Sequence, residues 1–294
     1  MDALGVMGGL PVEIRVDCVV GWGSIVRWFA QLSGSCGLSR LMLMFGGTAD
    51  EPAQVLGALM GSRLVASLEH LSLVSLGFLM DSMGTFAPLA SAGLKGLDLS
   101  YNAILDEGLE DFARLGWEGL EVLGLAFVDM GSAGLFAMMD EAGLCSVHTL
   151  DLAGMSAGRR QLEQLMLGDG GLGGLQSLGL ANLSMRGSVA RVVSGCKLPL
   201  TVLDLSNNGI GDVGIRVLAS SDVFEGLRAI DLRGNPITDV GADILLGSLG
   251  RRAGRECYLD LKVLSPEMQE RVLDCWPENQ WGFKRLNLSL EYGP

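Results

Sequence analysis

The chain is poor in aromatic side chains and in positive charge. Only 6% of its 294 residues are Phe, Trp or Tyr, and 21 Lys and Arg stand against 34 Asp and Glu, a formal net charge of −13. This charge repels phosphate backbones, so we expect no direct binding of nucleic acid. Glycine, by contrast, supplies 43 residues, about twice the share of roughly 7% in average proteins. Many glycines with few aromatic residues indicate many similar turns.

Residue types that build most metal and acid–base sites are also scarce. His70 and His148 are the only histidines, and the six cysteines are widely spaced, with no Cys-x-x-Cys pair. Such spacing does not suit a zinc site, and no Ser or Cys has the neighbourhood of a catalytic triad. We therefore expect no enzyme activity, no metal, and free thiols in a reducing compartment.

Long apolar runs are absent as well. The longest stretch, around residues 73–80, is far shorter than the roughly 18 apolar residues of a membrane span. The start, MDALGVMGGLPVEIRVD, has an acidic second residue and no basic segment ahead of an apolar one, unlike a secretory signal. These features predict a cytoplasmic protein without a membrane segment, whose apolar residues form a core.

What the sequence does contain is a repeated apolar pattern of the form LxxLxL. It starts at positions 11, 38, 68, 94, 120, 147, 175, 200, 227, 256 and 283, so that successive copies lie 25 to 30 residues apart. We number the columns of each repeat from its starting position. In every copy the fourth and sixth columns hold Leu, Ile or Val. Alternating apolar residues over so short a stretch predict a strand with one buried face.

Each strand is followed by a polar turn and an apolar-periodic segment that predicts a returning helix. Asp212 and Asp239 stand just before two of these segments, and Asp106 and Ser132 occupy the same column in two other repeats. An oxygen-bearing side chain at this point suits the N-cap of a helix. We therefore expect these residues to cap the helices that they precede.

The stretches LKGLDLSYNAILDEGL, LTVLDLSNNGIGDVGI and LRAIDLRGNPITDVGA resemble leucine-rich repeats of the ribonuclease-inhibitor-like class. The resemblance implies an α/β solenoid, a horseshoe of about eleven repeats with parallel strands on the concave face and helices on the convex face. It covers about residues 11–290, which predicts a single domain over 1–294. Its first repeat, about 1–37, is irregular, and its last strand, about 283–290, has no capping helix.

The resemblance also implies that an Asn in the ninth column bonds neighbouring backbone. Asn102, Asn208 and Asn235 match that position. Other repeats depart from the pattern with Leu76, Val128, Met155 and Leu183, so their turns require another solution.

One motif imitates a cofactor site. Gly209-x-Gly211-x-x-Gly214 lies between a predicted strand and a predicted helix, as the dinucleotide-binding fingerprint does. The next repeat places Pro236 and Thr238 in the columns of the first two glycines, so the motif is not a shared feature of the repeat. We expect no cofactor.

The remaining candidates are strand residues that alternate with the buried columns and should face solvent. Five fifth-column aspartates form a stripe that would steer a basic partner segment, although Asp is also common in this column of the family. Near the N-terminus, apolar residues in outward columns predict either an interface or a surface that the irregular first repeat covers. The predicted protein-binding residues are Met42, Met44, Phe45, Val74, Asp98, Tyr101, Phe127, Asp151, Asp204, Asp231, Asp260, Leu286, Leu288 and Leu290.

The sequence thus predicts a non-catalytic scaffold or adaptor, a subunit of a larger assembly that binds a protein on its concave face and ends. Because an uncovered last strand invites pairing, we expect another subunit to shield it. The alternative is an enzyme regulator, either a ribonuclease-inhibitor-like inhibitor or an activator of small GTPases. No Arg carries the signature of such an activator, and the acidic tail typical of them is absent. The recognition domain of an immune-type sensor is a third interpretation.

Overall fold

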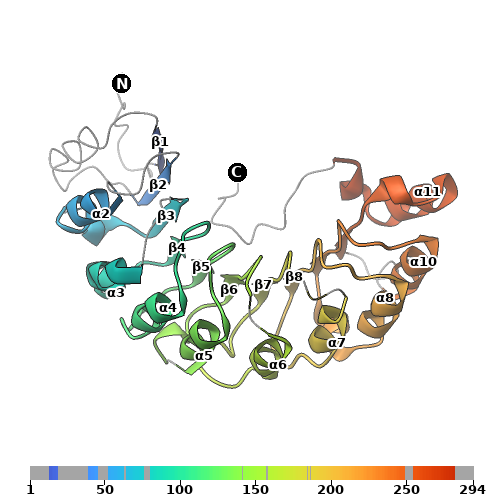
Figure 1. Ribbon diagram of the computed structural model, residues 1–294. Helices are drawn as coiled ribbons and strands as arrows, with labels where there is room; N and C mark the ends of the chain where they lie inside the picture. The colour runs from blue at the N-terminus through green and yellow to red at the C-terminus, as the bar shows by residue number, and fades with distance from the viewer. Residues whose placement is uncertain are drawn as a thin grey trace.

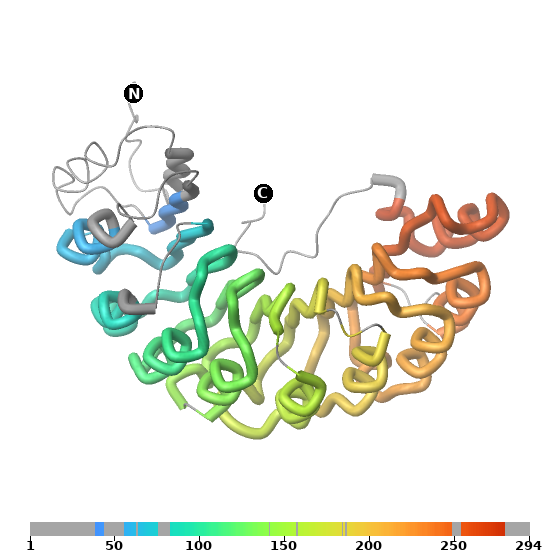
Figure 2. Tube along the Cα trace, viewed as in Figure 1, coloured from blue at the N-terminus to red at the C-terminus, as the bar shows by residue number. Residues whose placement is uncertain are grey.

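Ten parallel strands form one sheet, in chain order from β1 to β10. The sheet lines the inside of an arc, and the helices lie along its outside (Figure 1). The computed structural model describes residues 13–18, 39–45, 52–62, 64–75, 80–140, 142–156, 158–183, 185, 187–248 and 254–281. This arrangement is the predicted α/β leucine-rich repeat horseshoe, and Figure 2 shows each repeat as one turn of the coil.

Most strands are only three residues long. The strands are β1 (Glu13–Cys18), β2 (Arg40–Phe45), β3 (His70–Val74), β4 (Gly96–Asp98), β5 (Val122–Gly124), β6 (Thr149–Asp151), β7 (Ser177–Gly179), β8 (Val202–Asp204), β9 (Ala229–Asp231) and β10 (Glu256–Tyr258). Each is a short extended segment because the chain turns outward as soon as its two inward side chains are buried.

The return segments are mostly short helices. The α-helices are α2 (Pro52–Met60), α3 (Ala87–Ser91), α4 (Asp106–Ala113), α5 (Ser132–Asp140), α6 (Arg159–Leu167), α7 (Val189–Ser194), α8 (Asp212–Ala219), α9 (Asp222–Gly226), α10 (Asp239–Ser248) and α11 (Pro266–Cys275). Shorter 3₁₀ turns are η1 (Val65–Ser67), η2 (Met80–Phe86), η3 (Ala142–Leu144), η4 (Leu261–Val263) and η5 (Pro277–Trp281).

Identical columns of successive repeats lie side by side. Leu97 pairs with Leu71 on one side and Leu123 on the other, and the same in-phase register continues along the sheet. The fourth- and sixth-column side chains are buried in a single core that runs the length of the described repeats. Full burial of one such leucine stabilises the fold by roughly 1.5–3 kcal/mol, so the stacked rows of leucine are the main source of stability.

The tenth repeat begins two residues earlier than the sequence predicts. Cys257 pairs with Ile230 and Tyr258 pairs with Asp231, so Cys257 stands in the fourth column and the buried Leu259 in the sixth. A shift of two residues keeps the same side chains facing inward, and Cys packs as a small apolar residue. Asp260 therefore belongs to the seventh column, not the fifth.

The ninth-column asparagines bond neighbouring backbone, as expected from the resemblance. Asn208 donates its Nδ2 group to the carbonyl oxygens of Leu180, 2.6 Å away in the preceding repeat, and Leu205, 3.1 Å away. Its Oδ1 atom accepts a hydrogen bond from Leu183 N. Where the column departs from Asn, as at Val128 and Met155, the side chain is buried in the core instead.

The predicted caps act on the following repeat and not on their own helices. Asp212 is the first residue of α8, and its side chain makes no capping bond to that helix. Its Oδ1 atom accepts hydrogen bonds from Thr238 N (2.9 Å) and Gly241 N (3.1 Å) at the start of α10. Asp106 accepts from Gly131 N at the start of α5 in the same way, so the prediction that each Asp caps its own helix was wrong.

No helix among the described residues combines the length and apolar character that crossing a bilayer requires.

Candidate protein-binding face

The fifth-column aspartates do not form the exposed stripe that the sequence predicts. Asp98, Asp204 and Asp231 are only 6%, 8% and 1% exposed. Each carboxylate turns back to accept a hydrogen bond from the backbone N–H two residues further on, at 3.0, 2.8 and 3.0 Å. Neighbouring strands in a sheet lie about 4.8 Å apart, so adjacent rows cover these short side chains. Burial and local bonding make them part of the turn.

The middle of the concave face is closed by small residues. Asp151 is half-buried and accepts a hydrogen bond from Ala153 N. Ala126, Ala153 and Ala181, in the seventh column of three successive repeats, pack on one another and are buried. This part of the face presents a shallow, apolar floor with little charge.

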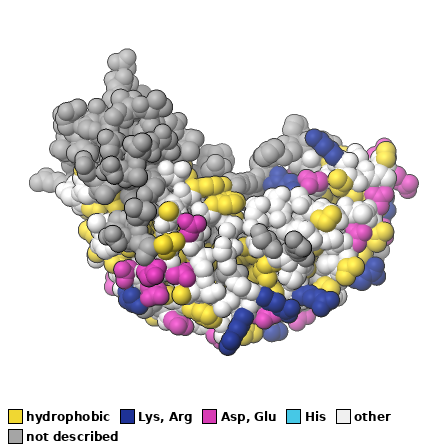
Figure 3. All heavy atoms as spheres, viewed as in Figure 1, with side chains coloured by type: hydrophobic (Ala, Val, Ile, Leu, Met, Phe, Trp, Pro, Cys, Tyr) yellow, Lys and Arg dark blue, Asp and Glu magenta, His cyan; other side chains and the backbone are white. Residues whose placement is uncertain are grey.

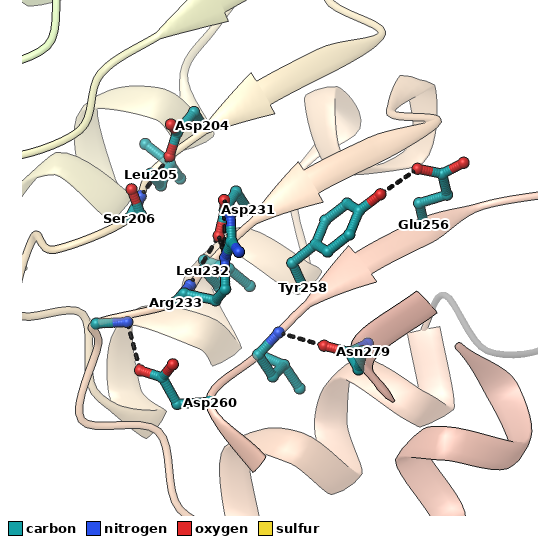
Figure 4. Close-up of polar contacts among 12 residues, drawn as sticks. Asp204, Leu205, Ser206, Asp231, Leu232, Arg233, Glu256, Tyr258, Asp260 and Asn279 are labelled. Atoms are coloured by element: carbon teal, nitrogen blue, oxygen red, sulfur yellow. Dashed lines mark hydrogen bonds and ion pairs between the residues drawn. The ribbon is translucent and has the colours of Figure 1, made fainter. Parts of the chain in front are cut away.

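A polar cluster lies at the C-terminal end of the concave face (Figure 4). Arg233 forms an ion pair with the buried Asp231 and lies over the Tyr258 ring, 5.5 Å from its centroid. The Tyr258 hydroxyl donates to Glu256 at 2.6 Å. Burial, together with the charge of Asp231 on the adjacent strand, raises the pKa of Asp204. The ion pair and these local bonds satisfy the buried charges within the cluster.

Asp260 differs from the other aspartates because its side chain is exposed. Its Oδ2 atom accepts a hydrogen bond from Gly234 N at 2.5 Å in the preceding repeat. Asp260 stands in the seventh column, beside Arg233, and its charge acts on Arg233 together with that of Asp231.

The predicted N-terminal anchors are only partly described. Met42 in β2 and Val74 in β3 are half-buried. Met44 and Phe45 belong to β2, and their side chains lie outside the described residues. Neither of the two interpretations of this apolar segment is therefore tested. The last predicted group, Leu286, Leu288 and Leu290, also lies outside the described residues.

The eighth column, which we call the turn column, has an unusual backbone conformation. It comprises Ser75, Tyr101, Phe127, Gly154, Asn182, Asn207 and Gly234, and φ at all of these residues lies between +54° and +72°. This left-handed conformation is costly for side chains other than Gly, Asn and Asp. It aims the N–H of Tyr101 at Ala126 O (2.8 Å) and that of Phe127 at Ala153 O (2.6 Å). The turn column thus links each of these repeats to the next.

Two adjacent turn-column positions carry large aromatic side chains. Tyr101 and Phe127 are stacked, with ring centroids 4.8 Å apart and an interplanar angle of 18°. They are nevertheless 47% and 37% exposed, the only exposed aromatic residues among the large hydrophobic side chains that the structure describes. Bulky residues in the left-handed region store about 1–3 kcal/mol each. We call these two residues the aromatic pair.

Gly154 allows the aromatic pair to lie flat on the next repeat. A Cβ atom at Gly154 would stand 2.5 Å from Cδ1 of Phe127. Because this glycine lacks a side chain, the Phe127 ring occupies the space above it. The glycine therefore serves both the left-handed turn and the placement of the ring.

Sequence reasoning selects Tyr101 and Phe127 as binding residues but gives them no distinguishing feature. The signal that could have found them is the turn column itself. Aligned by repeat, it reads Ser, Tyr, Phe, Gly, Asn, Asn, Gly from Ser75 to Gly234. From Ser75 to Gly234, two aromatic residues stand in a column otherwise filled by small or turn-forming residues, and Phe45 occupies the same column in the repeat that starts at 38.

The described residues contain no cluster suited to binding a metal ion. Nowhere among these residues do three or more His, Cys, Asp or Glu side chains meet in a way that could hold a metal ion. His70 and His148 are half-buried on β3 and beside β6. Burial is the main cause that lowers the pKa of His70, with Arg40 contributing. His148 lies 3.6 Å from Glu121, whose charge also acts on His70.

Comparison with protein families supports the repeat assignment. A model described as Leucine Rich repeat matches residues 94–113, 198–219 and 227–245. These three segments are similar to leucine-rich repeats. The match does not distinguish the ribonuclease-inhibitor-like class from others. Comparison with curated proteins finds no match.

Solved structures with a similar fold share little sequence with the chain. An internalin (inlF) from Listeria monocytogenes is 20% identical, with a TM-score of 0.41 and coverage of 76% of this chain and 54% of the internalin. TLR13, solved in a complex with ssRNA13, is 18% identical (TM-score 0.43, coverage 79% and 34%). A chain of the yeast Rad7 and Elc1 complex is 12% identical, with a TM-score of 0.46 and coverage of 87% of this chain and 78% of that one. This chain spans about half the length of the internalin and a third of TLR13.

Proposed function

We propose that the protein is a non-catalytic interaction module that binds a protein partner at the aromatic pair and the adjoining concave face. The observation that carries this proposal is that two stacked aromatic rings are held exposed in a strained backbone conformation. Strain of this kind persists where the surrounding structure enforces it, and it gathers at functional sites. Aromatic residues are also enriched among those that contribute most to protein interfaces.

The neighbourhood of the pair favours a partner that is apolar with some positive charge. Asp129, two residues after Phe127, is exposed, and so is Glu107 in the first turn of α4. Leu105, in the same loop as Tyr101, is a further exposed apolar residue. Exposed carboxylates close in sequence to the rings favour a partner segment that carries apolar and arginine side chains, in line with part of the predicted preference for a basic segment.

The experiment is a comparison of captured proteins between the wild-type chain and a double variant. In Y101N/F127N, Asn accepts the left-handed conformation while the rings are removed. A matched control, V240N/V263N, removes two exposed apolar residues on α10 and η4. We expect at least one protein to be captured by the wild-type chain and the control but not by Y101N/F127N. With that partner purified, its Kd for Y101N/F127N should be at least tenfold higher than for the wild-type chain.

Equal retention of every partner by wild type and Y101N/F127N would remove the aromatic pair from the interface. Loss of the same partners from the control would show that the effect is not specific to the pair. We retain as further parts of the proposal the role of a scaffold within a larger assembly and contacts through Met42, Met44, Phe45 and Val74.

A further inference from the structure

Charge is distributed unevenly along the arc. Residues 94–156 contain eleven Asp and Glu but only two basic residues, Lys95 and Arg114. Residues 157–221 contain four acids and six Lys or Arg. In Figure 3 acidic side chains gather at the lower left of the outer surface, over α4, and basic side chains lie along the bottom from the centre to the right, over α6 to α8. The protein is acidic overall, yet this part of its surface is basic.

Four arginines on three successive helices form most of this surface. Arg159 and Arg160 open α6, Arg191 lies in α7, and Arg216 lies in α8. All four are exposed. Arg159 bonds Glu163 through its Nε atom at 2.7 Å, a contact that uses one of the five N–H donors of the side chain. We call these four residues the arginine surface.

The position of Arg159 departs from the plan of the repeat. It occupies the column that holds Asp106, Asp212 and Asp239, the residues that bond the start of the following helix. A positive side chain in the first turn of a helix opposes the helix dipole and costs about 0.3–1 kcal/mol when exposed. The first turn of α6 contains no acidic residue to offset it. The ion pair of Arg159 with Glu163 offsets part of this cost, but helix stability does not account for a second arginine, Arg160, beside it.

A cleft of about 550 Å³ lies between the three helices, with Arg159 and Arg191 in its wall. Gly187, Gly209 and Gly211 form other parts of the lining. The acid in the lining, Asp212, is committed to the next repeat: its Oδ1 atom accepts from Thr238 N and Gly241 N, and its Oδ2 from Thr238 Oγ1 at 2.6 Å. The charge open to a ligand in this cleft is thus positive.

We propose that this cleft and the arginine surface bind a short acidic segment of a partner protein, whose carboxylates contact Arg159 and Arg191. A planar guanidinium pairs with a carboxylate through two parallel hydrogen bonds. A long polyanion such as nucleic acid would extend over the acidic surface of α4 and α5 and be repelled there. The site is separate from the aromatic pair.

The test uses fluorescence anisotropy of a labelled ten-residue peptide of alternating Asp and Glu, with an Asn and Gln peptide as the neutral probe. We expect the full chain to bind the acidic peptide at low salt, with affinity falling as salt rises. R159Q/R191Q should weaken binding about tenfold or more. The matched control R114Q/R228Q removes two exposed arginines elsewhere and should leave the affinity within twofold of wild type.

Three outcomes would overturn the proposal. The first is that wild type does not bind the acidic peptide better than the neutral one. The second is that both double variants lose affinity equally, which would indicate attraction by net charge alone. The third is that decathymidylate or ADP displaces the peptide at lower concentration than the unlabelled peptide does. Y101N/F127N should keep its affinity for the acidic peptide, so failure here is distinguishable from failure of the aromatic pair.

Discussion

Two adjacent residues show how a single column of a repeat can be used for a second purpose. The turn column needs a left-handed backbone because its N–H must reach the next repeat. Gly and Asn meet this need without strain, and five repeats use them or Ser. Tyr101 and Phe127 meet it at a cost, and their rings remain exposed. The fold alone would favour smaller residues at both positions.

We predict that Y101N/F127N is more stable than the wild-type chain. Relief of strain at two positions, at about 1–3 kcal/mol each, outweighs loss of an exposed ring stack worth about 0.5–1.5 kcal/mol. A net gain on the order of 1 kcal/mol would raise Tm by about 2–4 °C for a chain of this size. Thermal unfolding followed by circular dichroism measures the shift. A lower Tm in the variant would show that the stack outweighs the strain.

We also predict a stability difference between D204N and wild type that depends on pH. The raised pKa of Asp204 means that its ionised form is disfavoured in the folded state. Above that pKa the charge destabilises the fold, and as pH falls through it the protonated carboxyl removes the penalty. Asn keeps the oxygen that accepts from Ser206 N. D204N should therefore have the higher Tm at pH 7, with a difference that shrinks towards pH 4. A difference that stays constant with pH, or a less stable variant, would contradict this.

At the scale of elements, the helices depend on side chains from the repeat before them. Asp106, Asp212 and Asp239 each bond backbone N–H groups in the next repeat. The first N–H groups of a helix have no partner within the helix itself. These aspartates therefore link successive repeats in the helix layer, as the backbone hydrogen bonds between strands link them in the sheet.

D212A should destabilise the protein by about 1–2 kcal/mol, because Thr238 N and Gly241 N lose their acceptor. Hydrogen exchange should show faster opening at the start of α10 than at the start of α8. The control is D222A, at the exposed first residue of α9. If D222A cost as much as D212A, a general effect of charge on helix starts would explain both.

The elements were predictable where burial alone decides them. Leucines in the fourth and sixth columns must be covered, so period, strand position and sheet order follow from the sequence. The tenth repeat was misplaced because Cys257 takes a leucine position. Exposure of Asp98, Asp204 and Asp231 was misjudged because alternation gives the face of a strand but not the bend of a carboxylate towards its own backbone. The hydrogen-bond partners of the capping aspartates could not be predicted because they depend on the distance between successive repeats, which the sequence does not give.

At the scale of the whole molecule, each described repeat is stabilised by its neighbours, and the predicted strand over about 283–290 lies outside the described residues. Leu286, Leu288 and Leu290 remain the predicted contact with another subunit. We expect light scattering on the eluting protein to give a mass above the 31.0 kDa of one chain. L286K/L288K should reduce it to that of one chain without loss of helical signal. A wild-type chain that elutes at 31.0 kDa over a wide concentration range would exclude self-association through this strand.

The turn column has one more consequence. Asn182, Asn207 and Gly234 repeat, three rungs later, the arrangement of Tyr101, Phe127 and Gly154, and the Asn207 side chain lies where a Cβ of Gly234 would stand. Aromatic side chains introduced at positions 182 and 207 should therefore pack over Gly234 as Phe127 packs over Gly154. Equivalent turn-column positions in different repeats should therefore accept the aromatic pair. Exchanging two side chains would move the partner-binding site along the arc.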